Sequence, residues 1–121
     1  MENTYQTVFA SAVRAATVNS APYTNYGARG LHLVFDVTAI PGGDTVTPKI
    51  EGYDPTSGKY YDILVGAARA TTGTVTMRVY PSQVASANLA VADVLPSAWR
   101  VTMTHSAATN FTYSVGVSLL G

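Results

Sequence analysis

The chain contains no cysteine. Disulfide bonds, thiolate metal sites and cysteine nucleophiles are therefore all excluded. The stability of the fold has to come from side-chain packing and backbone hydrogen bonds, and the absence leaves the redox compartment open.

Charged side chains are scarce. They make up 12% of the 121 residues, against about 25% in ordinary globular domains. The seven basic and seven acidic residues cancel, so no net field draws the chain to nucleic acid or to anionic lipid. A surface this poor in charge is typical of a protein buried in a stable assembly. It is equally typical of a compact β domain coated with Thr, Ser and Ala.

Long apolar runs are also missing. No uninterrupted run approaches the ~20 residues of a membrane span, and no basic segment followed by an apolar one opens the sequence. We therefore expect no membrane partner and no export signal. The length suits one domain over residues 1–121, since a chain of this size can enclose a single core.

Apolar and polar residues alternate along most of the chain, which is typical of β-strands with one buried face. The clearest alternation predicts strands at 31–39, 74–80, 99–104 and 111–119. We expect the last two to form a terminal hairpin joined by residues 106–110.

Weaker patterns predict further strands at 9–18, 46–53 and 59–65. Asp54-Pro55-Thr56-Ser57-Gly58 favours a tight turn between the last two, and Pro48 suggests an edge strand or one that starts late. Residues 83–95 are interpreted as a long crossing loop. About seven antiparallel strands predict an all-β, two-sheet sandwich, either immunoglobulin-like or a small jelly roll.

Residues that could carry chemistry are few. His32 and His105 are the only histidines, and neither lies in a nucleophile, phosphate-loop or metal motif. His32 and Asp36 share a strand face but lie roughly 13 Å apart, which is too far for joint metal ligation. We therefore expect no enzyme activity, no metal site and no cofactor.

Tyrosine and arginine offer a binding surface instead, because both are enriched where proteins contact each other. Exposed tyrosines such as Tyr53, Tyr60, Tyr61 and Tyr80 could also stack on sugar rings, so carbohydrate binding stays an alternative, although nothing near them predicts a group that reads hydroxyls. The candidate interface residues are Tyr23, Tyr26, Arg29, Tyr53, Tyr60, Tyr61, Arg78, Tyr80 and Arg100.

Four stretches carry a resemblance to a known group: Gly27–Thr38, Ile50–Tyr61, Met77–Pro81 and Leu95–Val101. With the residues between them they span about residues 27–120, most of the chain, and they resemble small structural proteins of tailed bacteriophages. The similarity is greatest to capsid decoration, or cement, proteins of the head. None of the stretches marks a catalytic centre.

The resemblance implies a homotrimer on the outer surface of the virion, assembled in the host cytoplasm, that clamps neighbouring subunits of the major capsid protein. A tail component, or a module that binds carbohydrate or a receptor, is the alternative. Residues 1–29 are the least patterned part of the chain. They are interpreted as an N-terminal docking arm.

Overall fold

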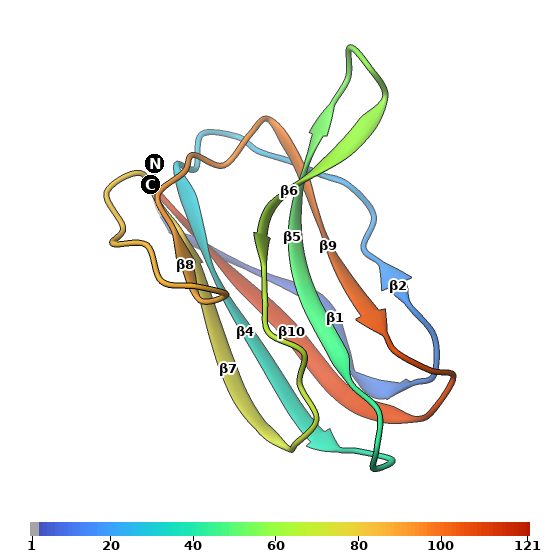
Figure 1. Cartoon of the computed structure of the whole chain (residues 1–121). Coiled ribbons are helices and arrows are strands. Elements are labelled where there is room, and N and C mark those ends of the chain that lie inside the picture. The colour runs from blue at the N-terminus through green and yellow to red at the C-terminus, as the bar shows by residue number, and fades with distance from the viewer. Residues whose placement is uncertain (1–2) are drawn as a thin grey trace.

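The computed structural model describes residues 3–121 and contains ten strands and no helix over that range (Figure 1). Seven of the strands have seven residues or more, and three have two. The strands are β1 (Thr4–Arg14), β2 (Val18–Asn19), β3 (Tyr23–Thr24), β4 (Gly30–Ala39), β5 (Val46–Asp54), β6 (Lys59–Val65), β7 (Gly73–Val79), β8 (Ala90–Val91), β9 (Ala98–His105) and β10 (Phe111–Leu120).

Two sheets pack face to face. Sheet A has the strand order β1-β10-β4-β7-β8, and sheet B has the order β2-β9-β5-β6, with β3 also paired to β9. Every pairing is antiparallel except that of β7 with β8. The predicted all-β, two-sheet sandwich is therefore confirmed, and the six long strands from β4 onward lie where the sequence pattern places them.

The pairing selects the jelly roll over the immunoglobulin-like sandwich. With β2 and β3 taken as one interrupted strand, the first strand pairs with the last (β10), the second with β9, β4 with β7, and β5 with β6. This nested order is that of one long antiparallel hairpin. Its turn lies at residues 54–59, and its two arms are rolled together into the two sheets. Two-sheet rolls of this kind are the jelly-roll class.

The core lies between the sheets and follows the predicted period of two. Phe35, Trp99, Phe111 and Tyr113 are among its largest fully buried side chains. The Phe35 and Tyr113 rings meet edge to face with centroids 5.5 Å apart. Within residues 3–121, no helix is present that is long and apolar enough to cross a membrane.

The expected terminal hairpin is wrong. β9 lies in sheet B and β10 in sheet A, so residues 106–110 cross from one sheet to the other. Both strands bury alternate residues, and their inner faces meet across the core: the His105 ring packs edge-on against Phe111. Alternation identifies each strand but does not indicate whether two successive strands share a sheet.

The expectation for Pro48 is also wrong, because β5 starts at Val46 and lies inside sheet B between β9 and β6. The Pro48 carbonyl accepts a hydrogen bond from the Gly66 amide, just beyond the end of β6. In a strand, the N–H and C=O of one residue point to the same side. The N–H that Pro48 lacks would therefore point towards Gly66, beyond the end of β6, and not towards β9. No bond to β9 is lost, which explains how an inner strand tolerates proline.

The N-terminal segment is built into both sheets rather than set apart from them. β1 pairs along β10 at the edge of sheet A, while β2 and β3 pair with β9 at the edge of sheet B. The strand expected at 9–18 is thus divided between two sheets. Residues 4–24 do not form a free arm, and the docking role given to residues 1–29 stays a prediction.

The place of β1 in the fold predicts unequal effects of two truncations in that strand. Phe9 is 9% exposed and belongs to the core, whereas Val13 is 61% exposed. Phe9→Ala should lower the free energy of unfolding by about 3 kcal/mol or more. Val13→Ala should change it by less than about 0.5 kcal/mol.

Chemical denaturation of the two variants and of the unchanged chain measures the difference. Equal, small effects at both positions would show that β1 is dispensable for the sandwich, as a detachable arm would be.

Candidate functional site: a tyrosine-rich end of the roll

Seven of the eight tyrosines lie towards one end of the sandwich, the exception being Tyr113. At this end β4, β6 and β9 begin and β5 and β7 end, and the β5–β6 hairpin projects from it (Figure 1). We call it the aromatic end. The tyrosines are Tyr5, Tyr23, Tyr26, Tyr53, Tyr60, Tyr61 and Tyr80. The connections at the opposite end, residues 15–17, 40–45, 66–72 and 106–110, contain no aromatic residue.

The roll brings together candidate residues from distant parts of the sequence. Tyr23 pairs with Trp99, and Tyr53 pairs with Tyr60. The Asn25 amide donates to the Ser97 carbonyl, which fixes the turn that carries Tyr26 and Arg29. Eight of the nine candidate interface residues thus lie at or next to the aromatic end, and Arg100 lies two residues into β9. Tyr5 was not among them, and its weakly patterned surroundings gave no signal for it.

A groove at the aromatic end is lined by Pro22, Tyr23, Thr24, Tyr53, Tyr60 and Ala98. The Tyr53 and Tyr60 rings are tilted against each other with centroids 4.9 Å apart. Tyr23 stacks on the buried Trp99 at 4.7 Å, so its ring is held in place from below. The groove therefore presents several aromatic rings and hydroxyl groups but no charged side chain in its lining.

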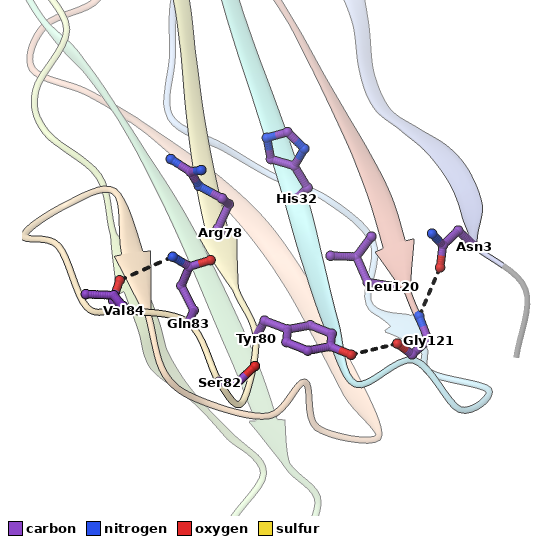
Figure 2. A pocket seen from close by; sticks show the side chains of 9 residues that line it. All are labelled: Asn3, His32, Arg78, Tyr80, Ser82, Gln83, Val84, Leu120 and Gly121. Atoms are coloured by element: carbon purple, nitrogen blue, oxygen red, sulfur yellow. Dashed lines mark hydrogen bonds between the residues drawn. The ribbon is translucent and has the colours of Figure 1, made fainter.

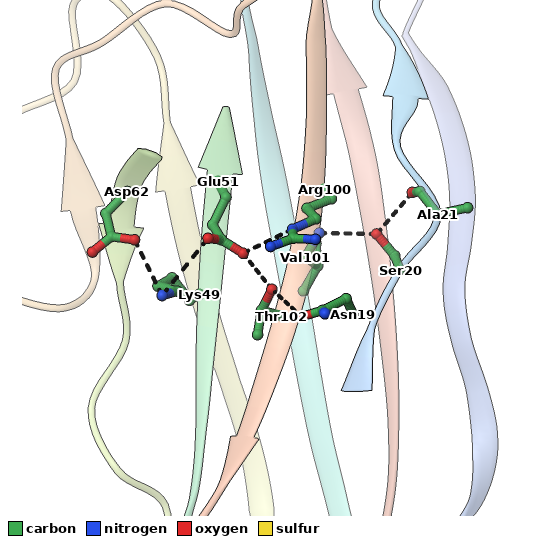
Figure 3. Close-up of polar contacts among 9 residues, drawn as sticks. All are labelled: Asn19, Ser20, Ala21, Lys49, Glu51, Asp62, Arg100, Val101 and Thr102. Carbon is green, nitrogen blue, oxygen red and sulfur yellow. Dashed lines mark hydrogen bonds and ion pairs between the residues drawn. The ribbon is translucent and has the colours of Figure 1, made fainter. Parts of the chain in front are cut away.

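An ion cluster on the outer face of sheet B supports this groove (Figure 3). The Arg100 guanidinium lies over the Tyr60 ring, 3.5 Å from its centroid, and Arg100 Nε donates to Glu51 Oε1 at 3.0 Å. Glu51 is only 6% exposed. Lys49 Nζ lies 3.7 Å from Glu51 Oε2 and 3.2 Å from Asp62 Oδ1. The two cations and two carboxylates compensate each other.

Neutral groups complete the surroundings of Glu51. The Thr102 hydroxyl donates to the Glu51 carboxylate and also lies within hydrogen-bond distance of the Asn19 side chain. Ser20, the next residue, accepts from the Val101 amide at 3.0 Å. These contacts hold the short β2 region against β9. Glu51 and Arg100 lie directly opposite each other on β5 and β9.

Tyr61 and Tyr80 lie outside this groove. Tyr61 pairs with Gly52 and its ring covers that glycine so closely that a Cβ there would lie 2.4 Å from the ring. It thus occupies the opposite face of the hairpin from Tyr53 and Tyr60. Tyr80 follows β7 in the other sheet. The four tyrosines share one end of the molecule, but they do not form one aromatic platform.

A second hollow lies beside the chain ends, on the outer face of sheet A (Figure 2). Arg78 and His32 are cross-strand partners on β7 and β4, and both line it. The Tyr80 hydroxyl donates to the Gly121 carbonyl at 2.8 Å, and the Gly121 amide donates to Asn3 Oδ1 at 3.1 Å. These bonds tie the end of β7 to both ends of the described chain.

A further cluster lies towards the opposite end, around the Arg14 guanidinium. That group lies 4.9 Å from the centroid of the Tyr113 ring and 5.2 Å from that of Phe9, and it donates to the Tyr113 carbonyl at 2.8 Å. Burial raises the pKa of Tyr113 to about 12, although the nearby Arg14 charge acts in the lowering direction. His105 Nε2 and the Tyr113 hydroxyl share a hydrogen bond of 2.9 Å. No signal in the sequence indicated this cluster.

The two histidines lie in different parts of the sandwich. His32 lies on the outer face of sheet A at the aromatic end, whereas His105 ends β9 and packs against Phe111 and Tyr113. Asp36 accepts a hydrogen bond from the Thr74 hydroxyl at 3.0 Å. Among residues 3–121, His, Asp and Glu side chains form no group of three or more that could hold a metal ion.

Comparisons with known proteins give a likeness of fold. No model of a known protein family matches the sequence, and no curated protein sequence matches it either. The fold is similar to that of one chain in the structure of infectious bursal disease virus Gx strain, with a TM-score of 0.53 and 12% identity. The match covers 97% of this chain and 31% of the viral chain, so this chain spans about a third of its neighbour.

The geometry of the Glu51 cluster predicts that Arg100 contributes more to the free energy of unfolding than Lys49 does. The Arg100→Ala change should lower the free energy of unfolding by about 2–3 kcal/mol, because it leaves a buried carboxylate without its closest cation. Lys49 is 27% exposed and contacts the half-exposed Asp62, so Lys49→Ala should cost less than about 1 kcal/mol. Urea denaturation gives both values, and a larger loss for Lys49→Ala would contradict this assignment.

His105 predicts a loss of stability in acid. Burial, together with the Arg14 charge, lowers the pKa of His105 below its usual 6.5. The unfolded chain therefore binds a proton at a higher pH than the folded chain does. The contribution of this residue to stability is complete above about pH 6.5 and is lost as the pH falls through the folded pKa.

Denaturation at a series of pH values measures this effect, and His105→Gln supplies the reference. As the pH falls below 6.5, the unchanged chain should lose more unfolding free energy than His105→Gln does. A difference that stays constant from pH 8 to about pH 4 would show that the environment of His105 does not act on its titration.

Proposed function

We propose that this chain is a non-enzymatic structural protein of a virion, a decoration protein that binds the outer surface of a capsid through its aromatic end. The observation that carries the proposal is the concentration of tyrosines at one end of the roll, while the opposite end has none in its connections. Tyrosine is enriched in the residues that dominate protein interfaces.

Three further observations support this role. The four stretches singled out in the sequence imply, by their resemblance, a tailed-phage decoration protein, and jelly rolls are common in viral capsid domains. The fold is similar to part of a viral structure. The formal net charge of zero would let many copies lie close together on one shell with little mutual repulsion.

The proposed mechanism is stabilisation by mass action. A protein that binds only the assembled lattice stabilises it by its free energy of binding, repeated at every site. No reaction is required. The partner in this proposal is the major capsid protein, and the resemblance favours a homotrimer that contacts several of its subunits.

Carbohydrate binding is the second candidate, and the groove between Tyr23, Tyr53 and Tyr60 favours it. Aromatic rings of this kind can stack on sugar rings, and Thr24 and the tyrosines supply hydroxyl groups. The groove lining contains no carboxylate or amide side chain to select among sugar hydroxyls. This is why attachment to protein is the first proposal.

The attachment proposal predicts a loss of binding when the aromatic end is altered. Tyr26 is 88% exposed, so Tyr26→Ala removes contact surface without disturbing the core. It should weaken binding roughly tenfold or more. Co-sedimentation of the purified protein with particles that lack it measures the affinity.

Ile40→Ala is the matched control, because Ile40 is an exposed apolar residue at the opposite end. It should leave co-sedimentation unchanged. Electron cryo-microscopy of particles carrying the protein then gives its location, expected at regular positions over the head. Density confined to the tail, or binding to glycans but not to particles, would reject the decoration role.

A further inference from the structure

The hollow on the outer face of sheet A has a lining rich in hydrogen-bond donors. It encloses about 550 Å³ and is lined by Asn3, His32, Arg78, Tyr80, Ser82, Gln83, Val84, Leu120 and Gly121. Figure 2 shows the Arg78 and His32 side chains side by side above Tyr80 and Gln83. None of the lining side chains is a carboxylate.

Arg78 differs from the arginines that hold the fold together. Arg14 donates to the Tyr113 carbonyl, Arg69 donates to the carbonyls of Thr71 and Thr72, and Arg100 pairs with Glu51. Among residues 3–121, the Arg78 guanidinium is in none of the ion pairs within 4 Å and donates no side-chain hydrogen bond. Its five N–H donors are thus available at the mouth of the hollow.

The wall below Arg78 is held in place by its own hydrogen bonds. The Tyr80 hydroxyl donates to Gly121, and Gln83 Nε2 donates to the Val84 carbonyl at 3.3 Å. Tyr80 also packs closely on Gly30, where an added Cβ would lie 2.8 Å from its ring. The Tyr80 side of the hollow is therefore held in place by the chain itself.

We infer that this hollow binds a carboxylate group. The planar fork of an arginine matches the two oxygens of a carboxylate, and His32 supplies a further nitrogen beside it. With histidine counted as neutral, Arg78 is the only charged side chain in the lining.

The inference does not depend on attachment to a virion, because it concerns binding of a small carboxylate to the isolated chain. The carboxylate could belong to an Asp or Glu side chain of a protein or to an acidic sugar. Two probes distinguish these sources: N-acetylglutamic acid α-amide for the protein side chain, and glucuronate for the sugar.

Nuclear magnetic resonance titration of the ¹⁵N-labelled full chain at pH 7 tests the inference. We expect binding with a dissociation constant on the order of millimolar, as is reasonable for a ligand of few atoms. The backbone signals of His32, Arg78 and Tyr80 should shift together. N-acetylglutamine amide, which has the same shape without the charge, should shift them much less.

Three variants locate the interaction. Arg78→Gln should weaken binding roughly tenfold or more, and Arg78→Lys should weaken it less because the charge is kept while the fork is lost. Lys59→Gln is the matched control, since it removes one exposed positive charge at the same end without altering the hollow. It should change the affinity less than about twofold.

Each outcome is decisive. Tighter binding of the glutamyl probe points to a protein partner and tighter binding of glucuronate to an acidic sugar, and both support a carboxylate site. Shifts that map elsewhere, equal losses in Arg78→Gln and Lys59→Gln, or tighter binding of inorganic phosphate than of either carboxylate would overturn the inference. A dispersed spectrum of each variant verifies that the fold is retained.

Discussion

The pairing of β10 with both β1 and β4 is the constraint on which the rest of the structure depends. β10 lies inside sheet A and joins the last part of the chain to the first and to residues 30–39. Its inward side chains, Phe111, Tyr113, Val115 and Val117, are all fully buried or nearly so. Without this strand, sheet A would separate into an isolated β1 and the set β4-β7-β8. The fold is therefore held by contacts between residues about a hundred positions apart in sequence.

The same nested pairing determines the composition of the aromatic end. Because most strands in the roll pair with one far along the chain, the connections at one end come from segments 20–29, 54–59, 80–89 and 92–97. Tyrosines separated by tens of residues thereby lie on a common surface. Arg100 links this surface to the sheet, since its guanidinium contacts the Tyr60 ring on one side and the buried Glu51 on the other.

Alternation in the sequence predicted the long strands and the all-β sandwich because burial of one strand face depends on each strand alone. It did not predict that β9 and β10 lie in different sheets, since that depends on which inner faces meet across the core. Pro48 was misinterpreted because its tolerance depends on where the neighbouring β6 ends. The candidate tyrosines were found by residue type, but their division among a groove, the back of a hairpin and a second hollow depends on strand register.

The edges of the two sheets favour attachment through the end of the roll rather than through its sides. An open strand edge binds a partner strand only where its backbone groups are free. On β1, Arg14 occupies the carbonyls of Ala10 and Ala12, and the pairing with β10 contains two irregularities. On β6, the last carbonyl, that of Val65, accepts from Asn88. With the β1 and β6 edges partly occupied by the chain itself, the aromatic end is the surface on which exposed tyrosine, an available arginine and two hollows coincide.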